Sequence, residues 1–564
     1  MLDNNYEIKL DNSKSKLSTL KINEYYVHSK YDPLKESKQF VEKHYRPGFI
    51  HILFGYGLGY IAKEFNRKFV NNEFLIVIEP IQQLTVNKED YTFLVQNTNA
   101  EIKTILSSII PNHANVTFIC SPNYDKLFPE YYLEVLDNIN NRLQMNKINE
   151  NTLRRFSSEW QRNFIYNLKN IPYDGDLENV FQKYDLPIIL ASGGPSLTKQ
   201  IDLLKEYRNH CILIAAGSTV NTLVQFGLEP DFVVSIDGGE NNLKHFERKK
   251  FTKSKLVYSL LNHYKIRDCF EDGYHFITSD ASGVEGYYKN LSGKKLISLR
   301  GGSSVASYAL SFARYISKGP IALIGQDLAY TDNKTHAEFN NNYKEVDDKY
   351  IEKRQMFYTE GYFGDKVLTD HAFYSMKETL EVLIGELKNK DRIFNCTEGG
   401  ALIQGFQNIP FKQFCGNYIN KSFYNRELIL SVSRRAFHNN LIENLNNDLS
   451  NYKKMRKLIL DNLMLLEKTK GKWIFSSTIL MKMDENEQNF RKILDKTSIS
   501  ISIELVTFDI LKYYLPKKDE TKNEAYRRIY TQNYEMFNDF LKVIKEAYIY
   551  TQNIIDELME KIQK

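Results

Sequence analysis

PIILASGGPSL, residues 187–197, is the stretch that decides the fold. A short run of apolar residues that ends in a glycine pair is typical of a strand buried on both faces of a parallel sheet. Gly193 and Gly194 let the backbone approach a ligand closely, and the N–H groups of a helix starting near Leu197 attract a phosphate. The stretch therefore predicts a strand, a phosphate-binding turn and a helix. A tight turn without a ligand is the alternative.

Further apolar stretches of strand length follow, with helical stretches between them. This alternation predicts a mostly parallel sheet covered on both faces, with ligands bound at the carboxyl ends of the strands. The expected strands are residues 187–191, 211–215, 232–236, 256–259, 275–278 and 321–324.

Small and polar residues follow several of these strands directly. Ser218 comes after the second strand, although a helix N-cap alone would explain a serine there. Asp237 follows the third, where a carboxylate suits ribose hydroxyls or a metal, and where a simple Asp-Gly turn is equally expected. Arg300 precedes a glycine- and serine-rich helix start, which predicts a second anion cradle. The convergence of these groups on one sheet edge, more than any single motif, predicts a nucleotide cleft.

A separate α/β unit precedes this region. An apolar strand at residues 49–54 runs into Gly55-x-Gly57-x-Gly59, a helix over 60–69 and a strand over 74–78 that ends at Glu79. Glycines followed by an acid after the next strand are the pattern of a methyltransferase, in which the acid binds ribose hydroxyls. A structural Rossmann-like domain explains the same pattern, and no downstream Asn/Asp-Pro-Pro-aromatic motif is present.

The composition limits the remaining classes. The 75 Lys and Arg residues against 70 Asp and Glu leave a net charge of +5 without a basic stripe, so a nucleic-acid partner is not expected. Five scattered cysteines without CxxC spacing fit a reducing compartment. No apolar run is long enough to span a membrane, and the first residues lack a signal peptide's apolar core. A cytoplasmic protein is expected.

Six motifs in order, LASGGPS, AAGSTV, PDFVVSIDGG, LRGGSSVAS, ALIGQDLAYT and CTEGGALIQG, look like those of the bacterial motility accessory factor family. In that family the central domain is similar to bacterial sialyltransferases. Its members are implicated in transferring nonulosonic acids (pseudaminic or legionaminic acid) from CMP donors onto Ser/Thr of flagellin. The resemblance implies a Rossmann-like N-terminal domain (1–170), a Rossmann-type, sialyltransferase-like central domain (171–420) and an all-α C-terminal domain (421–564). Leucines at helical spacing beyond residue 426 agree with the last.

The resemblance also implies roles for individual residues. His371, before a helix, is the expected base that removes the acceptor proton, with His336 as its rival. Asp327 and Tyr330 would lie near the donor phosphate and sugar, where a Tyr hydroxyl and backbone N–H groups stabilise the departing phosphate. No metal is expected. The residues expected to bind the donor are Gly193, Gly194, Pro195, Ser196, Gly217, Ser218, Asp237, Gly302, Ser303, Gly325 and Gln326.

Two alternatives to the transferase remain besides the methyltransferase. The central motifs also resemble archaeal pterin pyrophosphokinases, which would use ATP and Mg²⁺ with Asp237 or Asp327 as ligands. A noncatalytic flagellin chaperone, with the C-terminal helices against its partner, is the other.

Overall fold

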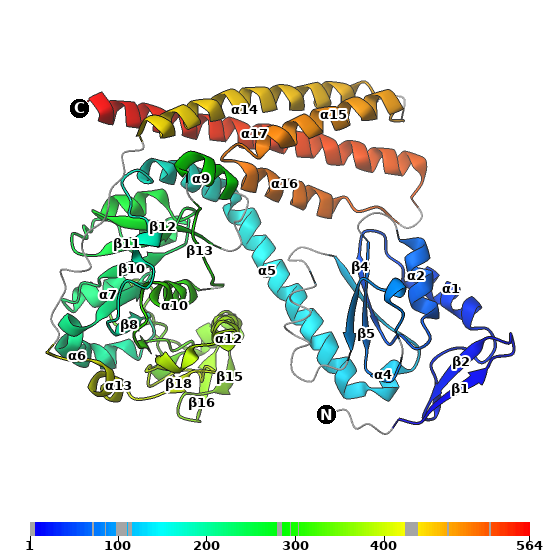
Figure 1. Cartoon of the computed structure of the whole chain (residues 1–564), viewed down its shortest axis with the longest axis horizontal. Coiled ribbons are helices and arrows are strands. Elements are labelled where there is room, and N and C mark those ends of the chain that lie inside the picture. Colours follow the sequence, from blue (N-terminus) through cyan, green and yellow to red (C-terminus); the bar gives the residue numbers. More distant parts are fainter. Residues whose placement is uncertain are drawn as a thin grey trace. The chain divides into compact units, whose positions relative to one another are not determined.

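The fold is seen in a computed structural model (Figure 1), which describes residues 6–69, 73–84, 86–96, 110, 115–278, 285–293, 295–302, 304–422, 438–470, 473–517 and 520–563. Contacts divide the chain into two compact units. The first comprises Met1–Arg155, Leu460–Asp484 and Glu504–Phe540, and the second comprises Phe156–Ile459, Glu485–Ile503 and Leu541–Lys564. Each is described by itself below. The domain boundaries at 170/171 and 420/421 stay predictions.

The second unit is built on a nine-stranded sheet in the order β13-β12-β11-β10-β9-β8-β14-β17-β18. All of its paired strands are parallel. From β8 the chain adds strands on one side as far as β13, and then returns to place β14 on the other side of β8. This reversal is the switch point at which open α/β sheets bind ligands. The strands are β8 (Ile188–Ala191), β9 (Ile212–Ala216), β10 (Phe232–Ser235), β11 (Lys255–Ser259), β12 (Gly273–Thr278), β13 (Ser298–Leu299), β14 (Ile321–Ile324), β17 (Ile393–Asn395) and β18 (Gln407–Asn408).

The six predicted strands are confirmed to within two residues at each end. Their apolar side chains form the core because both faces of the sheet are covered. Helix α10 (Val305–Ile316) contacts β8, β9 and β10, and nine of its twelve residues are buried. The short strands β13, β17 and β18 are too brief to give a sequence pattern and were not expected.

Four helices and a hairpin follow the strands that meet at the switch point. Helices α6 (Leu197–Tyr207) and α7 (Thr219–Gln225) follow β8 and β9. Between β14 and β17 the chain inserts a short helix, α11 (Asp348–Arg354), and a hairpin of β15 (Phe357–Glu360) and β16 (Lys366–Thr369). Helix α12 (His371–Gly385) completes this insertion.

The first unit contains a smaller parallel sheet in the order β6-β5-β4-β7, together with an antiparallel sheet of β1, β2 and β3. The strand–turn–helix–strand pattern predicted for residues 49–78 is confirmed as β4, α2 and β5. The elements are β1 (Ile8–Asn12), β2 (Ser18–Ile22), β3 (Tyr25–Tyr26), α1 (Pro33–His44), β4 (Ile50–Phe54), α2 (Tyr60–Lys68), β5 (Leu75–Glu79), β6 (Phe93–Gln96), β7 (Val116–Cys120) and α4 (Tyr124–Leu127).

The long helices carry the chain from one unit to the other. The helical C-terminal region is confirmed in α14 (His438–Glu467), α15 (Ser477–Leu494), α16 (Ser500–Tyr513) and α17 (Lys522–Gln563). Helix α5 (Pro129–Asn167) leads from the first sheet to the second. Across the described residues, no helix has the length and apolar character needed to cross a membrane.

The glycine turn of the first unit is filled by the protein's own side chains. A Cβ on Gly55 would lie 2.3 Å from the Tyr124 ring, and one on Gly57 would lie 2.4 Å from Nε2 of His28. Glu79 is completely buried. Its carboxylate accepts hydrogen bonds from the Tyr56 and Gly57 N–H groups at 2.7 and 3.3 Å, and from the Tyr124 hydroxyl at 2.9 Å. The acid that would bind a cofactor ribose is therefore already engaged, which favours the structural interpretation of this domain.

Because this turn is filled, we expect no saturable binding of S-adenosylmethionine to the full-length protein in isothermal titration calorimetry at ligand concentrations up to about 1 mM, the weak end of specific affinities. The cofactor would have to displace Tyr124 and break the hydrogen bonds of Glu79. Micromolar binding would reverse this interpretation and restore the methyltransferase. CMP, titrated into the same preparation, tests that the protein used is able to bind a nucleotide.

Candidate functional site

A cavity of about 260 Å³ opens at the carboxyl ends of β8, β9, β10 and β14, at the switch point of the large sheet. It lies within the second unit. Eight of the residues that line this cavity were predicted from the sequence to bind the donor or to take part in catalysis. They are Gly193, Gly194, Ser218, Asp237, Gly325, Gln326, Asp327 and His336. Convergence of the strand-end motifs on one cavity is therefore observed.

A buried carboxylate joins the turn after β8 to the turn after β14. Asp327 is 1% exposed, and its oxygens accept hydrogen bonds from the Ser196 N–H at 3.2 and 3.3 Å, from the Ser196 hydroxyl at 2.6 Å and from the Thr331 hydroxyl at 2.6 Å. The Gly194 N–H donates to the Gly325 carbonyl at 2.8 Å. A Cβ on Gly194 would lie 2.1 Å from the Asp327 carboxylate. The two turns thus fit together only with glycine at position 194.

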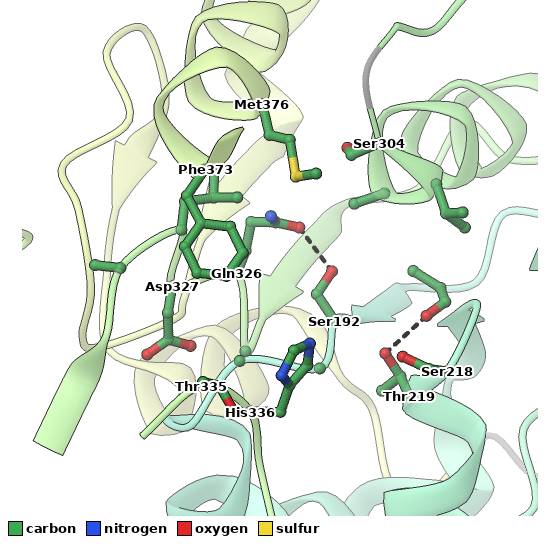
Figure 2. A pocket seen from close by; sticks show the side chains of 18 of the residues that line it. Ser192, Ser218, Thr219, Ser304, Gln326, Asp327, Thr335, His336, Phe373 and Met376 are labelled. Carbon is green, nitrogen blue, oxygen red and sulfur yellow. Dashed lines mark hydrogen bonds between the residues drawn. The ribbon is translucent and has the colours of Figure 1, made fainter. Parts of the chain in front are cut away.

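A second hydrogen bond crosses the same two turns inside the cavity. The Ser192 hydroxyl donates to Oε1 of Gln326 at 2.6 Å, as Figure 2 shows. The Gln326 N–H donates to the Thr397 hydroxyl at 3.2 Å. Since Oε1 accepts from Ser192, the carboxamide nitrogen is the end of Gln326 left to donate to a ligand.

The start of α10 supplies anion-binding character. Ser304 caps this helix by accepting from the Ser307 N–H, and Ser304, Val305 and Ala306 all line the cavity. The first N–H groups of a helix lack partners within it and carry the positive end of its dipole. Among the described residues that line the cavity there is neither lysine nor arginine. A phosphate bound here would be held by N–H and hydroxyl donors.

His336 reaches the cavity from the loop after β14. The Ala337 N–H donates to the Gly193 carbonyl at 2.9 Å, which fixes this loop against the glycine turn. Nδ1 of His336 is buried and has no hydrogen-bond partner among the described residues. Burial lowers the pKa of the imidazole to about 4, so the ring is neutral near pH 7. Figure 2 places the ring among the residues lining the cavity.

Asp237 lines the cavity from the end of β10. Its side chain is exposed, and its carboxylate has no hydrogen-bond or ion-pair partner in the described part of the chain. The protein around it raises the pKa of this carboxyl above its usual value by desolvation. The carbonyl of the same residue accepts from the Asn242 side chain at 2.8 Å and from the His263 N–H at 3.2 Å.

Two of the predicted catalytic residues lie outside the cavity lining. His371 is exposed at the first position of α12, where its ring packs 5.0 Å from that of Phe357. Tyr330 is buried and its hydroxyl donates to Asp370, the N-cap of α12, at 2.8 Å. Neither prediction of direct access to a substrate is supported, since a helix start fixes a residue's position but not the direction of its side chain.

Other predicted donor-binding residues also lie outside the lining. The Ser196 hydroxyl and N–H point to Asp327 and so shape the turn without facing the cavity. A Cβ on Gly302 would lie 2.4 Å from the Thr379 side chain, so this glycine allows close packing against α12. Pro195 and Gly217 are also absent from the cavity lining, and Ser303 lies outside the described residues.

The apolar wall of the cavity was not predicted. Phe373 and Met376 of α12 line it together with Ile236 and Leu328. Figure 2 shows Phe373 and Met376 projecting from the same helix. Their i, i+3 spacing puts both on one helix face. That spacing was readable from the sequence, but it is equally typical of a helix packed on a core.

Asp237, Asp327 and His336 are the side chains of the described lining that could contact a metal ion. Across the described residues, no group of three or more His, Cys, Asp or Glu side chains is placed to hold an ion. The Asp327 oxygens already accept from Ser196 and Thr331, so this residue would have to give up those bonds to become a ligand.

The geometry thus defines an α/β domain with a cavity at the switch point of its parallel sheet. A sequence model of the family described as 6-hydroxymethylpterin diphosphokinase MptE-like matches residues 162–333. Among solved structures, a MAf glycosyltransferase from Magnetospirillum magneticum AMB-1 is similar with a TM-score of 0.54 and 15% sequence identity, over 99% of this chain and 95% of that one. No curated protein matches the sequence. At this identity the structural match establishes a shared fold over nearly the whole chain.

Replacing Asp327 tests the importance of the junction between the two turns. Asp327→Asn keeps the size of the side chain but places an NH₂ group against the donors of Ser196 and Thr331. We therefore expect the free energy of unfolding to fall by about 1–3 kcal/mol. The melting temperature should fall by about 2–4 °C per kcal/mol, measured by calorimetry, and CMP affinity should fall with it.

Asp332→Asn is the matched control. Within the part of the chain that the structure describes, the Asp332 carboxylate forms one exposed ion pair, with Lys199 at 2.9 Å, and asparagine tolerates its positive φ of 53°. Equal melting temperatures for both variants would show that the Asp327 hydrogen bonds do not hold the site together.

Proposed function

We propose that this protein is a glycosyltransferase that takes a sugar from a nucleotide donor bound in the cavity at the switch point. The similarity of fold to a MAf glycosyltransferase over nearly the whole chain supports this proposal. So does the position of the cavity, where open α/β sheets bind nucleotides.

The observation that carries the proposal is a cavity lining that combines N–H and hydroxyl groups with no cationic side chain among the described residues. The groups left to donate to a ligand are the Ser218 hydroxyl, the carboxamide nitrogen of Gln326 and the N–H groups at the start of α10, because the hydroxyls of the other serine and threonines beside the strand ends already donate within the protein. Such groups suit a single phosphate of low charge. Transfer of a phosphoryl group from a triphosphate instead relies on cations and metal ions that neutralise the developing charge. The lining favours a nucleoside monophosphate sugar over ATP.

The size of the cavity agrees with a partly enclosed donor. Its 260 Å³ lies just below the range of about 300–1,000 Å³ typical of sites for whole small molecules. We infer that the cavity holds the phosphate and its neighbouring groups. The rest of the donor and the acceptor then lie on its open side.

For the donor and acceptor we propose a CMP-activated nonulosonic acid, pseudaminic or legionaminic, and Ser/Thr of flagellin. This rests on the six motifs, of which five contribute residues to the cavity lining. The reaction is a direct displacement at the anomeric carbon, with the departing phosphate stabilised by the N–H groups at the start of α10 and by the carboxamide of Gln326. Flagellum assembly and motility would depend on it, and a cytoplasmic location would follow from the acceptor.

The match to a pterin diphosphokinase family supports one alternative, an ATP-dependent enzyme. Asp237 would then be the available metal ligand, because Asp327 is engaged with Ser196 and Thr331. The absence of cations from the described lining weighs against it.

Coexpression tests the proposed transfer. Flagellin made together with this protein and a CMP-nonulosonic acid pathway should gain the mass of one or more nonulosonic acid residues in intact-mass spectrometry. Omitting the sugar pathway is the control, and should leave flagellin unmodified. Flagellin that binds the protein but gains no mass with the donor supplied would support a noncatalytic chaperone instead.

Metal removal separates the two enzymatic alternatives. With purified protein we expect CMP to bind equally well before and after treatment with EDTA, measured by isothermal titration calorimetry, because the described residues contain no cluster of carboxylates and histidines that could hold an ion. ATP binding that appears only with added Mg²⁺, combined with no binding of CMP, would instead support the diphosphokinase.

A further inference from the structure

Three ionisable side chains line the described part of the cavity, and they differ in their hydrogen-bond partners and in their exposure to solvent. The carboxylate of Asp327 already accepts hydrogen bonds from two hydroxyls and one N–H group. Nδ1 of His336 has no partner, but this atom is buried and out of reach of solvent. Asp237 alone of the three combines an exposed side chain with an unpaired carboxylate.

We propose that Asp237 is the catalytic base of the transfer, the group that takes the proton from the acceptor hydroxyl. The proposal rests on the proposed glycosyltransferase function. It replaces the histidines, His371 and His336, to which the sequence assigned this step, and it gives Asp237 a role other than binding ribose or a metal.

The strand order leaves room for a sugar between Asp237 and the glycine turn. Strand β9 lies between β10, which Asp237 follows, and β8, which the glycine turn follows. Two strand spacings correspond to about 10 Å, which is enough for a sugar ring with its phosphate on the side of Gly193 and Gln326. Direct displacement requires the base and the leaving group on opposite faces of the sugar. The separation of these two strand ends leaves room for that arrangement.

The backbone around Asp237 is fixed although its carboxylate is free. A Cβ on the next residue, Gly238, would lie 2.6 Å from Nδ2 of Asn163 and 2.8 Å from the Leu261 carbonyl. That Asn163 nitrogen donates to the Gly238 carbonyl at 2.9 Å and to the Leu261 carbonyl at 3.2 Å. Helix α5 therefore holds the turn on one side and Asn242 holds the Asp237 carbonyl on the other. A rigid support with one unpaired reactive group is what a positioned base needs.

The chemistry balances without a metal or a further reactant. The acceptor oxygen forms a bond to the anomeric carbon while its proton passes to the Asp237 carboxylate. The bond from the anomeric carbon to the phosphate oxygen breaks, and its electron pair leaves with CMP. Asp237 then returns its proton to solvent. Partial desolvation raises the pKa of this carboxyl, which makes it a stronger base than an ordinary aspartate at the same pH.

Asp237→Asn tests the assignment because it preserves shape and removes basicity. The rate of transfer to flagellin from a CMP-nonulosonic acid, followed by CMP release, should fall about 10²–10⁴-fold. The Kd for CMP should stay within about twofold, since the base faces the acceptor. The melting temperature should not change, since the carboxylate has no partner to lose.

Glu247→Gln, an exposed carboxylate on the segment after α8 (Glu240–Leu243), is the matched control and should transfer at the rate of the unmodified protein. His336→Ala compares the rival base directly, and should keep at least a tenth of the rate. Near-normal transfer by Asp237→Asn overturns the proposal. So does a loss of CMP affinity that equals its loss of rate, which would make Asp237 a donor-binding residue. If the unmodified protein itself transfers nothing, the proposed function fails and not the choice of base.

Discussion

The junction between β8 and β14 depends on one buried carboxylate. Asp327 and Ser196 are 131 residues apart in the chain, yet their turns are joined by three hydrogen bonds. Burying a carboxylate is costly unless donors surround it, and here two hydroxyls and a backbone N–H do so. The strands β8 and β14 pair directly in the sheet, and this interaction extends their junction into the two turns beyond the strand ends. Both turns line the cavity, so its shape depends on their being held together.

This constraint also separates the roles of the two glycines in the central turn. Gly194 is required by packing, since any side chain there would strike Asp327 or the Gly325 carbonyl. A Cβ on Gly193 would instead lie 3.0 Å from the Asn340 amide and 3.7 Å from the His336 ring, on the side of the loop that helps to line the cavity. Gly194 therefore allows the two turns to pack together, and Gly193 leaves space for Asn340 and His336 on the cavity side. Ser196, which looks like a phosphate ligand in sequence, belongs to the junction.

The sequence predicted what depends on local pattern. Apolar runs gave the strands of the large sheet, and the rule that ligands bind at strand carboxyl ends brought Ser218, Asp237 and Gln326 to one cavity. It could not predict which residues at the start of α12 face the cavity, so it assigned His371 to the site, whereas the lining takes Phe373 and Met376 from this helix. Nor could it find Phe373 and Met376, because an apolar helix face has the same pattern whether it meets a ligand or a core.

The two glycine turns of the chain show why such a motif does not define a site by itself. Both follow a buried strand and precede a helix. In the first unit a fully buried tyrosine, Tyr124, occupies the space over Gly55 and binds Glu79, so the turn is closed. In the second unit the turn lines a cavity that it shares with His336, Phe373 and Met376. Whether a glycine turn admits a ligand is therefore decided by residues distant in sequence, which fill the space above it or leave it open.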